Sequence, residues 1–299
     1  MREASPEPRA SIASLGAALA VVAVVVLGLA SSAAAELTGS FKAFEQCPYA
    51  NTEVSRCLNV LTEQGEFVLG KTEVPIVNPV TLQAGVTKAS GEFSKLIAAR
   101  NGDTLSRTPQ PVPGGLLGIA APKNAGSMIS AVTALLFANP VTGVSATLEL
   151  ALPANRVLLS ELHLGEGEET AMKLPVKIHL ENALLGASCY VGSARSPILL
   201  ELTSGSTNPP PPNKTMTGSS GFIEFIESGR ILETKGAKLV DNAWVAPSAS
   251  GCGGPLSFLV DPIIDEAIGL PSPAGYNTAL LQGKISIATA VTLGKVAGE

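Results

Sequence analysis

The sequence has few of the side chains that hydrolases use for acid–base chemistry. Charged residues make up 15% of the 299 positions, aromatic residues make up 4%, and there are only two histidines. Aspartate occurs at four positions, Asp103, Asp241, Asp261 and Asp265. A carboxylate pair of the glycosidase type is compatible with this composition, but the aromatic platforms that normally accompany such a pair are scarce. A hydrolase is therefore disfavoured, and we interpret the single tryptophan, Trp244, as core or half-buried.

Motifs that mark nucleophilic, phosphate-binding and zinc sites are also missing. No G-x-S-x-G elbow occurs, and in the nearest imitation, GASC at 186–189, Tyr190 replaces the last glycine. The glycines around Cys252 lack the lysine of a phosphate-binding loop. No two cysteines have the close spacing of a structural zinc site. We predict no catalytic residue, no metal and no cofactor, and the sequence does not reveal a ligand-binding residue.

The two histidines have ordinary interpretations. His179 shares the polar face of an expected strand with Lys177 and Glu181, so we expect it to be solvated. His163 follows Glu161 at the same strand parity, beside the acidic turn 165–170. Glu161 and His163 together are suited to weak metal binding, but no second pair of ligand residues lies at a useful spacing. We therefore favour an ordinary surface position for His163.

The charge balance argues against one class of partner. The formal net charge is −5. A weakly charged acidic chain cannot neutralise many phosphates, so we do not expect it to bind nucleic acid.

The N-terminus has the pattern of a secretory signal peptide. Arg2 and Arg9 precede the apolar run 12–30, and the small residues of 31–35 form a cleavage site before Glu36. An uncleaved signal anchor is the alternative, since the apolar run is long enough to span a bilayer. Cleavage is favoured, which leaves residues 36–299 as a single β-rich extracellular domain. We expect it to be secreted, or loosely associated with the cell envelope.

Four cysteines in an exported chain indicate two disulfides, for which the sequence allows three connectivities. Cys47 and Cys57 flank a short loop, whereas Cys189 and Cys252 lie in turns rich in glycine and serine. We expect Cys47 to bond to Cys57 and Cys189 to bond to Cys252.

The 30 glycines and 22 prolines are typical of many short strands joined by turns. The clearest pair is 174–203, where Val176 and Ile178 alternate with polar residues before the Cys189 loop, and Leu200 and Leu202 alternate with polar residues after it. Further strands are expected at 66–70, 74–86, 93–98, 144–150, 157–164, 222–227, 230–234, 238–245 and 284–293. We expect 144–150 to pair with 157–164. We expect the last strand, near the C-terminus, to pair inside the sheet.

One helix is well signalled. Asp261 suits the N-cap, Pro262 suits the first helical position, and Gly269 with Pro271 ends the helix. The stretch 108–148 is different, because Lys123 is its only charged residue. Its part 127–137 is compatible with a buried helix or a core strand. We favour a core element over an exposed surface for lipid or a partner.

Three runs, 180–214, 239–254 and 269–288, together resemble a group of secreted proteins from actinobacteria that have no assigned activity. The resemblance extends over most of the chain after residue 35. It implies export, pairing of Cys189 with Cys252 and a β-rich body. It implies no activity, and no functional residue can be transferred.

These observations predict an all-β fold, an antiparallel sandwich or partly closed barrel of about ten strands with one or two short helices. The leading function is a non-catalytic secreted or cell-envelope protein that acts through its surface, with a cell-envelope component or lipid as candidate partner. The alternative is a protein that binds an apolar ligand or lipid, and a secreted hydrolase comes third. A side-chain-filled interior favours the first, and an apolar cavity of roughly several hundred Å³ favours the second.

Overall fold

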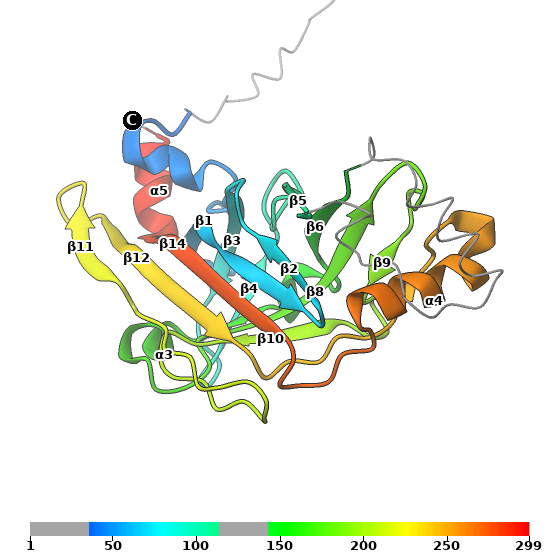
Figure 1. Cartoon of the computed structure of the whole chain (residues 1–299). Coiled ribbons are helices and arrows are strands. Elements are labelled where there is room, and N and C mark those ends of the chain that lie inside the picture. The colour runs from blue at the N-terminus through cyan, green and yellow to red at the C-terminus, as the bar shows by residue number, and fades with distance from the viewer. Residues whose placement is uncertain (1–35, 114–142, 299) are drawn as a thin grey trace, which may run out of the picture. The chain divides into compact units, whose positions relative to one another are not determined.

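The computed structural model describes residues 36–113 and 143–298, and Figure 1 shows an antiparallel β architecture in this part of the chain. Its fourteen strands form one connected sheet, whose main path runs β11-β12-β14-β1-β3-β4-β7-β8-β6-β5. The sheet does not close on itself, since β11 and β5 end the path. The predicted all-β fold class is confirmed, with more strands than expected.

One layer is built on the longest strand, β1, which pairs with β14, β3 and β2. β14 pairs on its other side with β12, and β12 pairs with β11. The strands of this layer are β1 (Val54–Leu69), β2 (Thr72–Pro75), β3 (Val80–Thr87), β11 (Phe222–Ile226), β12 (Ile231–Asp241) and β14 (Thr278–Thr289).

A bulge in β1 between Thr62 and Gln64 lets this strand bend against β14. Gly65 follows the bulge with φ +142°, and a Cβ atom there would lie 1.9 Å from the carbonyl oxygen of Leu280. Only glycine fits that close approach of two backbones.

The facing layer is built on β8 (Met172–Glu181), which pairs with β6, β7, β9 and β10. Strand β4 connects the layers, because it pairs with β3 on one side and β7 on the other. The remaining strands are β4 (Ser94–Ile97), β5 (Pro109–Pro111), β6 (Ser145–Leu150), β7 (Leu158–Leu159), β9 (Tyr190–Val191), β10 (Ile198–Leu202) and β13 (Ala249–Ser250).

The predicted central pair of strands is confirmed. β10 runs antiparallel to β8 with Ile198 opposite Val176 and Leu202 opposite Met172. The inward residues of both strands are buried, and the polar residues between them face outward. Their buried side chains belong to a core that fills the space between the layers.

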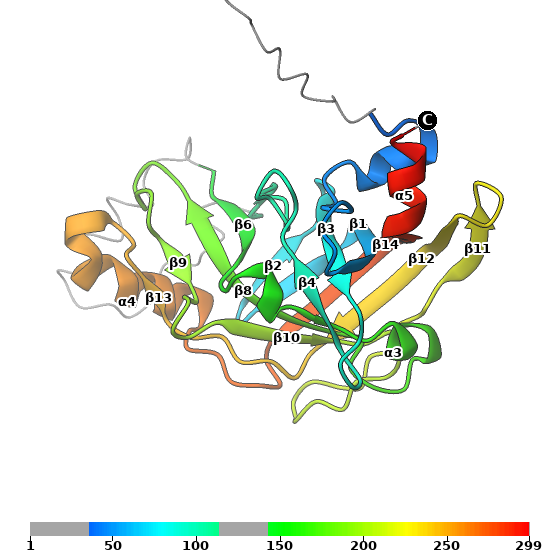
Figure 2. The same cartoon turned by 180° about the vertical axis from the view of Figure 1, so that it is seen from behind.

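A second, smaller apolar cluster lies at the other end of β1. It joins the 3₁₀ helix η1 (Gly39–Phe44) to the C-terminal helix α5 (Ala290–Val296), with Phe41, Phe44 and Leu293 buried in it. The Cys47–Cys57 disulfide belongs to this cluster, whereas the Cys189–Cys252 disulfide belongs to the main core. Figures 1 and 2 both show η1 and α5 side by side.

Several segments differ from their predicted structure. The expected strands 230–234 and 238–245 form the single strand β12, and the expected strand 66–70 is only the end of β1. The expected strand 157–164 is short, because Ser160 caps the helix α3 (Glu161–Glu166) and its Oγ accepts the N–H of His163. Its strand part, β7, pairs with β4 and β8, and β6 pairs with β5 and β8. The expected pairing of 144–150 with 157–164 is therefore wrong.

The expected strand 284–293 ends at Thr289, whose side chain accepts the N–H of Thr292 and caps α5. The predicted helix near Asp261 exists as α4 (Ser257–Ile268), but it starts earlier than predicted. Pro262 lies inside it instead of at its first position. Its end at Gly269 is confirmed, and that residue adopts the left-handed conformation with φ 84°.

Short 3₁₀ turns complete the described elements, as η2 (Ala154–Arg156) and η3 (Gly254–Leu256). The predicted core element 127–137 lies outside the described residues, as does the signal segment 1–35. No helix in the part of the chain that the structure describes has the length and apolar character needed to cross a membrane.

Candidate functional site

The space between the two layers contains a cavity of about 80 Å³. Its walls are almost entirely apolar and come from both layers, including Val60, Leu82, Ala146, Leu174 and Leu281. Pockets that bury a drug-sized ligand have roughly 300 to 1,000 Å³. The interior is thus filled mostly by side chains, and the cavity is too small to enclose such a ligand without rearrangement.

In the part of the chain that the structure describes, the edge strand β11, at one end of the sheet (Figure 1), carries several exposed apolar side chains. We call its five residues, Phe222–Ile226, the β11 edge. Phe222 and Phe225 each expose 68% of their surface, and Ile223 exposes 46%. Because neighbouring residues of a strand point to opposite sides, apolar side chains are offered on both faces.

One neighbouring strand and the backbone at its two ends hold β11 in place. Within the described residues, β11 pairs with β12 and with no other strand. Gly221 leads into it with φ +78°, where a Cβ atom would lie 2.5 Å from the carbonyl oxygen of Lys235. At the other end, Glu227 and Ser228 form the hairpin tip with φ 52° and 58°, the only non-glycine residues with positive φ in the described chain. Positive φ values are common in hairpin turns, so this geometry fixes the end of β11.

The charges near the β11 edge are already paired. Lys235 on β12 forms ion pairs with Glu224 and Glu233, and the neighbouring Lys284 lies 3.4 Å from Glu233. The hydrogen bond and charge of Glu224 raise the pKa of Lys235, which stays a cation. The edge therefore presents an apolar strand with little net charge.

His179 is not solvated as predicted. Its ring stacks on Tyr190 with centroids 4.4 Å apart, and its side chain is only 13% exposed. Nζ of Lys177 lies 3.8 Å from the centroid of the Tyr190 ring and 3.1 Å from Oε2 of Glu149. The other carboxylate oxygen of Glu149 faces Nδ1 of His179. Nε2 of His179 is buried without a hydrogen-bond partner. Stacking on Tyr190 and the adjacent Lys177–Glu149 ion pair therefore shield the His179 side chain from solvent.

A depression of about 240 Å³ adjoins Lys177 and Tyr190 on the same sheet. Its walls include Gly192, Ser193 and Ser250, and it offers no histidine or carboxylate. This composition gives no histidine–carboxylate pair for general acid–base catalysis, and its lysine, Lys177, is already paired with Glu149.

His163 is also buried, at 8% exposure, so the predicted surface position is wrong. The helix α3 carries it, and Glu161 on the same helix turns away to pair with Arg56. The predicted Glu161–His163 pair is therefore not formed. The structure instead brings Glu92 to His163, with 3.3 Å between Oε1 and Nδ1.

The four cysteines form two disulfides, Cys47–Cys57 and Cys189–Cys252, the pairing expected from the sequence. Ser188 donates a hydrogen bond to the carbonyl oxygen of Gly251, so it ties the disulfide loop to the following turn. Trp244 is 3% exposed, which confirms its predicted core position. Two disulfides are typical of proteins in an oxidising compartment.

The sequence Asn213-Lys214-Thr215 matches the acceptor pattern for N-glycosylation. The structure directs the Asn213 amide inward, where Nδ2 donates to the carbonyl oxygens of Asn242 at 2.9 Å and Asn277 at 2.8 Å. In the folded chain, Nδ2 of Asn213 is therefore occupied by two structural hydrogen bonds.

Sequence reasoning missed the β11 edge because FIEFI reads as an ordinary strand. The signal that could have found it is the absence of proline or lysine, which usually protect exposed edges. Comparison of the chain with protein-family models, curated proteins and solved structures finds no match.

Proposed function

We propose that this chain is a non-catalytic secreted or cell-envelope protein that binds another protein through the β11 edge. The observation that carries the proposal is the open side of β11, where a strand edge that no described strand pairs with is combined with two phenylalanines that are each 68% exposed. Natural proteins normally blunt such edges, because an exposed apolar strand recruits other chains. An edge without that protection suits a docking function.

The proposed occupant is an extended segment of a partner protein that adds a strand beside β11. In this mode backbone hydrogen bonds supply affinity, and side chains of alternating orientation supply specificity. Phe222 and Phe225 would contact apolar side chains of the added strand on opposite faces. A polar or basic residue opposite Glu224 would complete the match.

A second copy of this chain fits less well. In a symmetric antiparallel pair that overlaps the whole strand, the middle residue Glu224 lies opposite its own copy. Like charges directly opposite each other destabilise a strand pair. This argument favours a different chain as the partner.

Binding of an apolar ligand in the interior is the second candidate. It rests on the almost wholly apolar walls of the cavity between the layers. The volume of about 80 Å³ is the argument against it, since a bound lipid chain would have to push the layers apart. The hydrolase proposal has the weakest support, because the described histidines lie in separate clusters.

The test uses the mature chain and a displayed library of random extended peptides. Peptides selected on the wild-type chain should lose at least about tenfold in affinity for the Phe222→Thr/Phe225→Thr variant, since anchoring aromatics dominate such interfaces. The matched control is Phe258→Thr, which removes an equally exposed phenylalanine, at 70%, from α4. Hydrogen exchange should show new protection of the amides in 222–226 when peptide binds.

Two results would overturn the proposal. Peptides that bind the double variant as well as the wild type would exclude the β11 edge as the docking site. A dimer in sedimentation experiments that the double variant abolishes would make a second copy the occupant instead. Protection confined to the cavity walls of β1 and β6 would favour the apolar-ligand alternative.

A further inference from the structure

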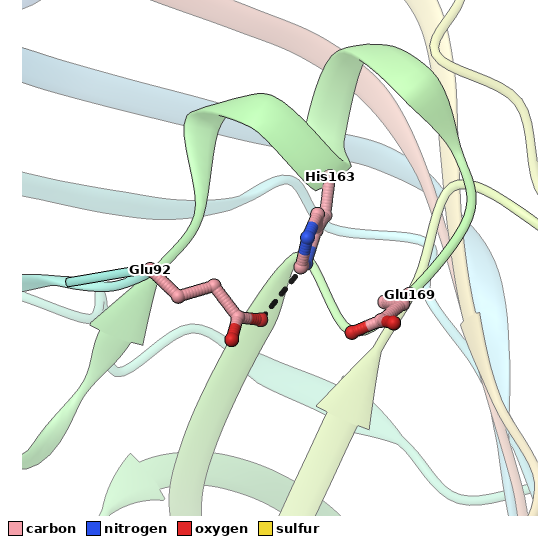
Figure 3. A group of neighbouring side chains, drawn as sticks. All are labelled: Glu92, His163 and Glu169. Carbon is pink, nitrogen blue, oxygen red and sulfur yellow. Dashed lines mark ion pairs between the residues drawn. The ribbon is translucent and has the colours of Figure 1, made fainter.

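Three side chains from separate segments converge beside α3 (Figure 3). Glu92 comes from the turn between β3 and β4, His163 from α3, and Glu169 from the turn after that helix. One nitrogen or carboxylate oxygen from each lies within 4.8 Å of the others. These residues are distant in sequence, so the fold alone brings them together.

The histidine at the centre is held firmly. Phe93 packs edge-on against its ring with centroids 6.3 Å apart, and Nδ1 lies 3.2 Å from the carbonyl oxygen of Thr170. Ser204 donates to the carbonyl oxygens of His163 and Leu164, which fixes α3 to the strand region behind it. Nδ1 of His163 faces both the Thr170 carbonyl oxygen and Glu92, so a metal ion bound between the ring nitrogen and the carboxylates would replace the hydrogen bond to Thr170.

The turn that carries Glu169 is also fixed. Thr203 Oγ1 donates to the carbonyl oxygen of Glu169 at 2.7 Å. On the other side, the bond from the N–H of Ser90 to the carbonyl oxygen of Phe93 closes the turn that presents Glu92. Both carboxylates are exposed, so rigid backbones deliver them to one point while their side chains stay free to adjust.

The charges of this cluster are unbalanced. Glu92 has its ion pair with His163, and no described lysine or arginine pairs with Glu169. Lys173 lies over the Phe93 ring, but its ammonium group pairs with Glu201 at 3.0 Å. Apart from the imidazole, no cationic side chain of the described residues pairs with either carboxylate in this small space. A divalent cation would compensate both negative charges at once.

We propose that Glu92, His163 and Glu169 form a binding site for a divalent transition-metal ion, with zinc as the best fit. An imidazole nitrogen with two carboxylate oxygens is a zinc ligand set, and a water molecule completes the tetrahedron. Calcium and magnesium prefer oxygen ligands alone, which makes them poorer candidates. Bound zinc would clamp the β3–β4 turn to α3 and to the turn after α3.

The test measures zinc binding by calorimetry on the metal-free, untagged mature chain, because a histidine tag would add sites of its own. We expect one zinc ion per chain, and Glu92→Gln and Glu169→Gln should each weaken binding by at least about tenfold, since even outer-shell changes cost that much. Both replaced side chains are exposed, so the variants should fold normally. Glu168→Gln is the matched control, because it removes the neighbouring exposed charge in the same turn.

Cobalt provides a second readout, since its visible absorption distinguishes tetrahedral from octahedral ligand sets. Zinc should also raise the melting temperature of the wild type and of Glu168→Gln, but not of Glu92→Gln/Glu169→Gln. Equal losses in Glu168→Gln and the two site variants would mean general attraction to an acidic turn and would overturn the proposal. Stoichiometric binding of calcium but not zinc, or no zinc binding by the wild type, would also overturn it.

Discussion

Asp261 accepts a hydrogen bond from the backbone N–H of Cys252, with 2.7 Å between Oδ1 and the nitrogen. Its second oxygen accepts the N–H of Gly251 at 3.2 Å, and Asp265, one turn later on α4, accepts the N–H of Ala249 at 2.7 Å. The helix thus holds the segment that carries one half of the Cys189–Cys252 bond. Two of the four aspartates in the sequence therefore serve structure.

The first prediction concerns Asp261. Asp261→Ala should lower the free energy of unfolding by about 1 to 3 kcal/mol, because two partly buried N–H groups lose their acceptor. Glu266→Ala is the control, since it removes an exposed negative charge from the same helix. Urea unfolding of both variants measures the difference. Equal stability of the two would show that these hydrogen bonds contribute nothing.

The second prediction concerns the long-range disulfide, which joins residues 63 positions apart. Cys189→Ser and Cys252→Ser should each cost about 2 to 5 kcal/mol, because the bond restricts the unfolded chain. The double variant should cost little more than either single variant, since both changes remove the same bond. Calorimetric melting tests this. Full additivity of the two single effects would contradict it.

Cys47→Ser offers an internal comparison for the chain-entropy account of disulfide stability. The Cys47–Cys57 bond closes a loop with a sequence separation of 10. On that account the short loop contributes about 3 kcal/mol and the long loop about 4 kcal/mol. A larger loss in Cys47→Ser than in Cys189→Ser would rule out loop length as the deciding factor.

The third prediction concerns Asn213, whose amide bonds two carbonyl oxygens. Asn213→Asp replaces the donor with an acceptor facing those oxygens, so it should destabilise the fold by about 1 to 3 kcal/mol or more. Asn208→Asp, in the same loop but exposed, should have little effect. Thermal unfolding compares them, and a glycan found on Asn213 of the folded chain would contradict the inward orientation.

The fourth prediction concerns pH. Burial raises the pKa of the Asp241 carboxyl, although the N–H groups of Ala243 and Glu201 act in the opposite direction. The folded chain therefore holds this proton more tightly than the unfolded chain. The resulting stability is complete below the unfolded pKa, near 4, and is lost as the pH rises through the folded pKa.

Asp241→Asn does not titrate, so its cost relative to the wild type should shrink between about pH 3.5 and about pH 7. Urea unfolding at both pH values measures this cost. Asp103→Asn, in an exposed turn, should show little such change. A cost for Asp241→Asn that grows with pH would mean that the folded-state pKa is lowered.

Alternation along the chain predicted the parts of the fold where one face of a strand meets the core. β10 follows this rule along its whole length, and β8 follows it except at Pro175, which is buried between two buried neighbours. The pattern failed at 157–164, where Ser160 starts a helix after two strand residues. It failed again at Thr289, where a hydroxyl cap ends β14. A single capping side chain decided both cases, and periodicity does not detect it.

The candidate sites depend on contacts that periodicity cannot reveal. Glu92 and Glu169 reach His163 only because β4 pairs with β7 and α3 follows directly. The environment of His179 depends on Tyr190, which arrives through the pairing of β9 with β8. The open side of β11 is likewise a property of the strand order and not of the strand itself.

The position of β14 has a consequence for how the chain assembles. β14 is the last strand along the described chain, and it lies between β12 and β1. β1 is the longest strand, and it begins far earlier in the sequence, at Val54. Until residues 278–289 are available, β1 and β12 each lack a neighbour, and the cluster of η1 with α5 lacks one of its sides. The layer can therefore close only after residues 278–289 have been delivered, so folding should be slow and should depend on contacts between segments far apart in the sequence.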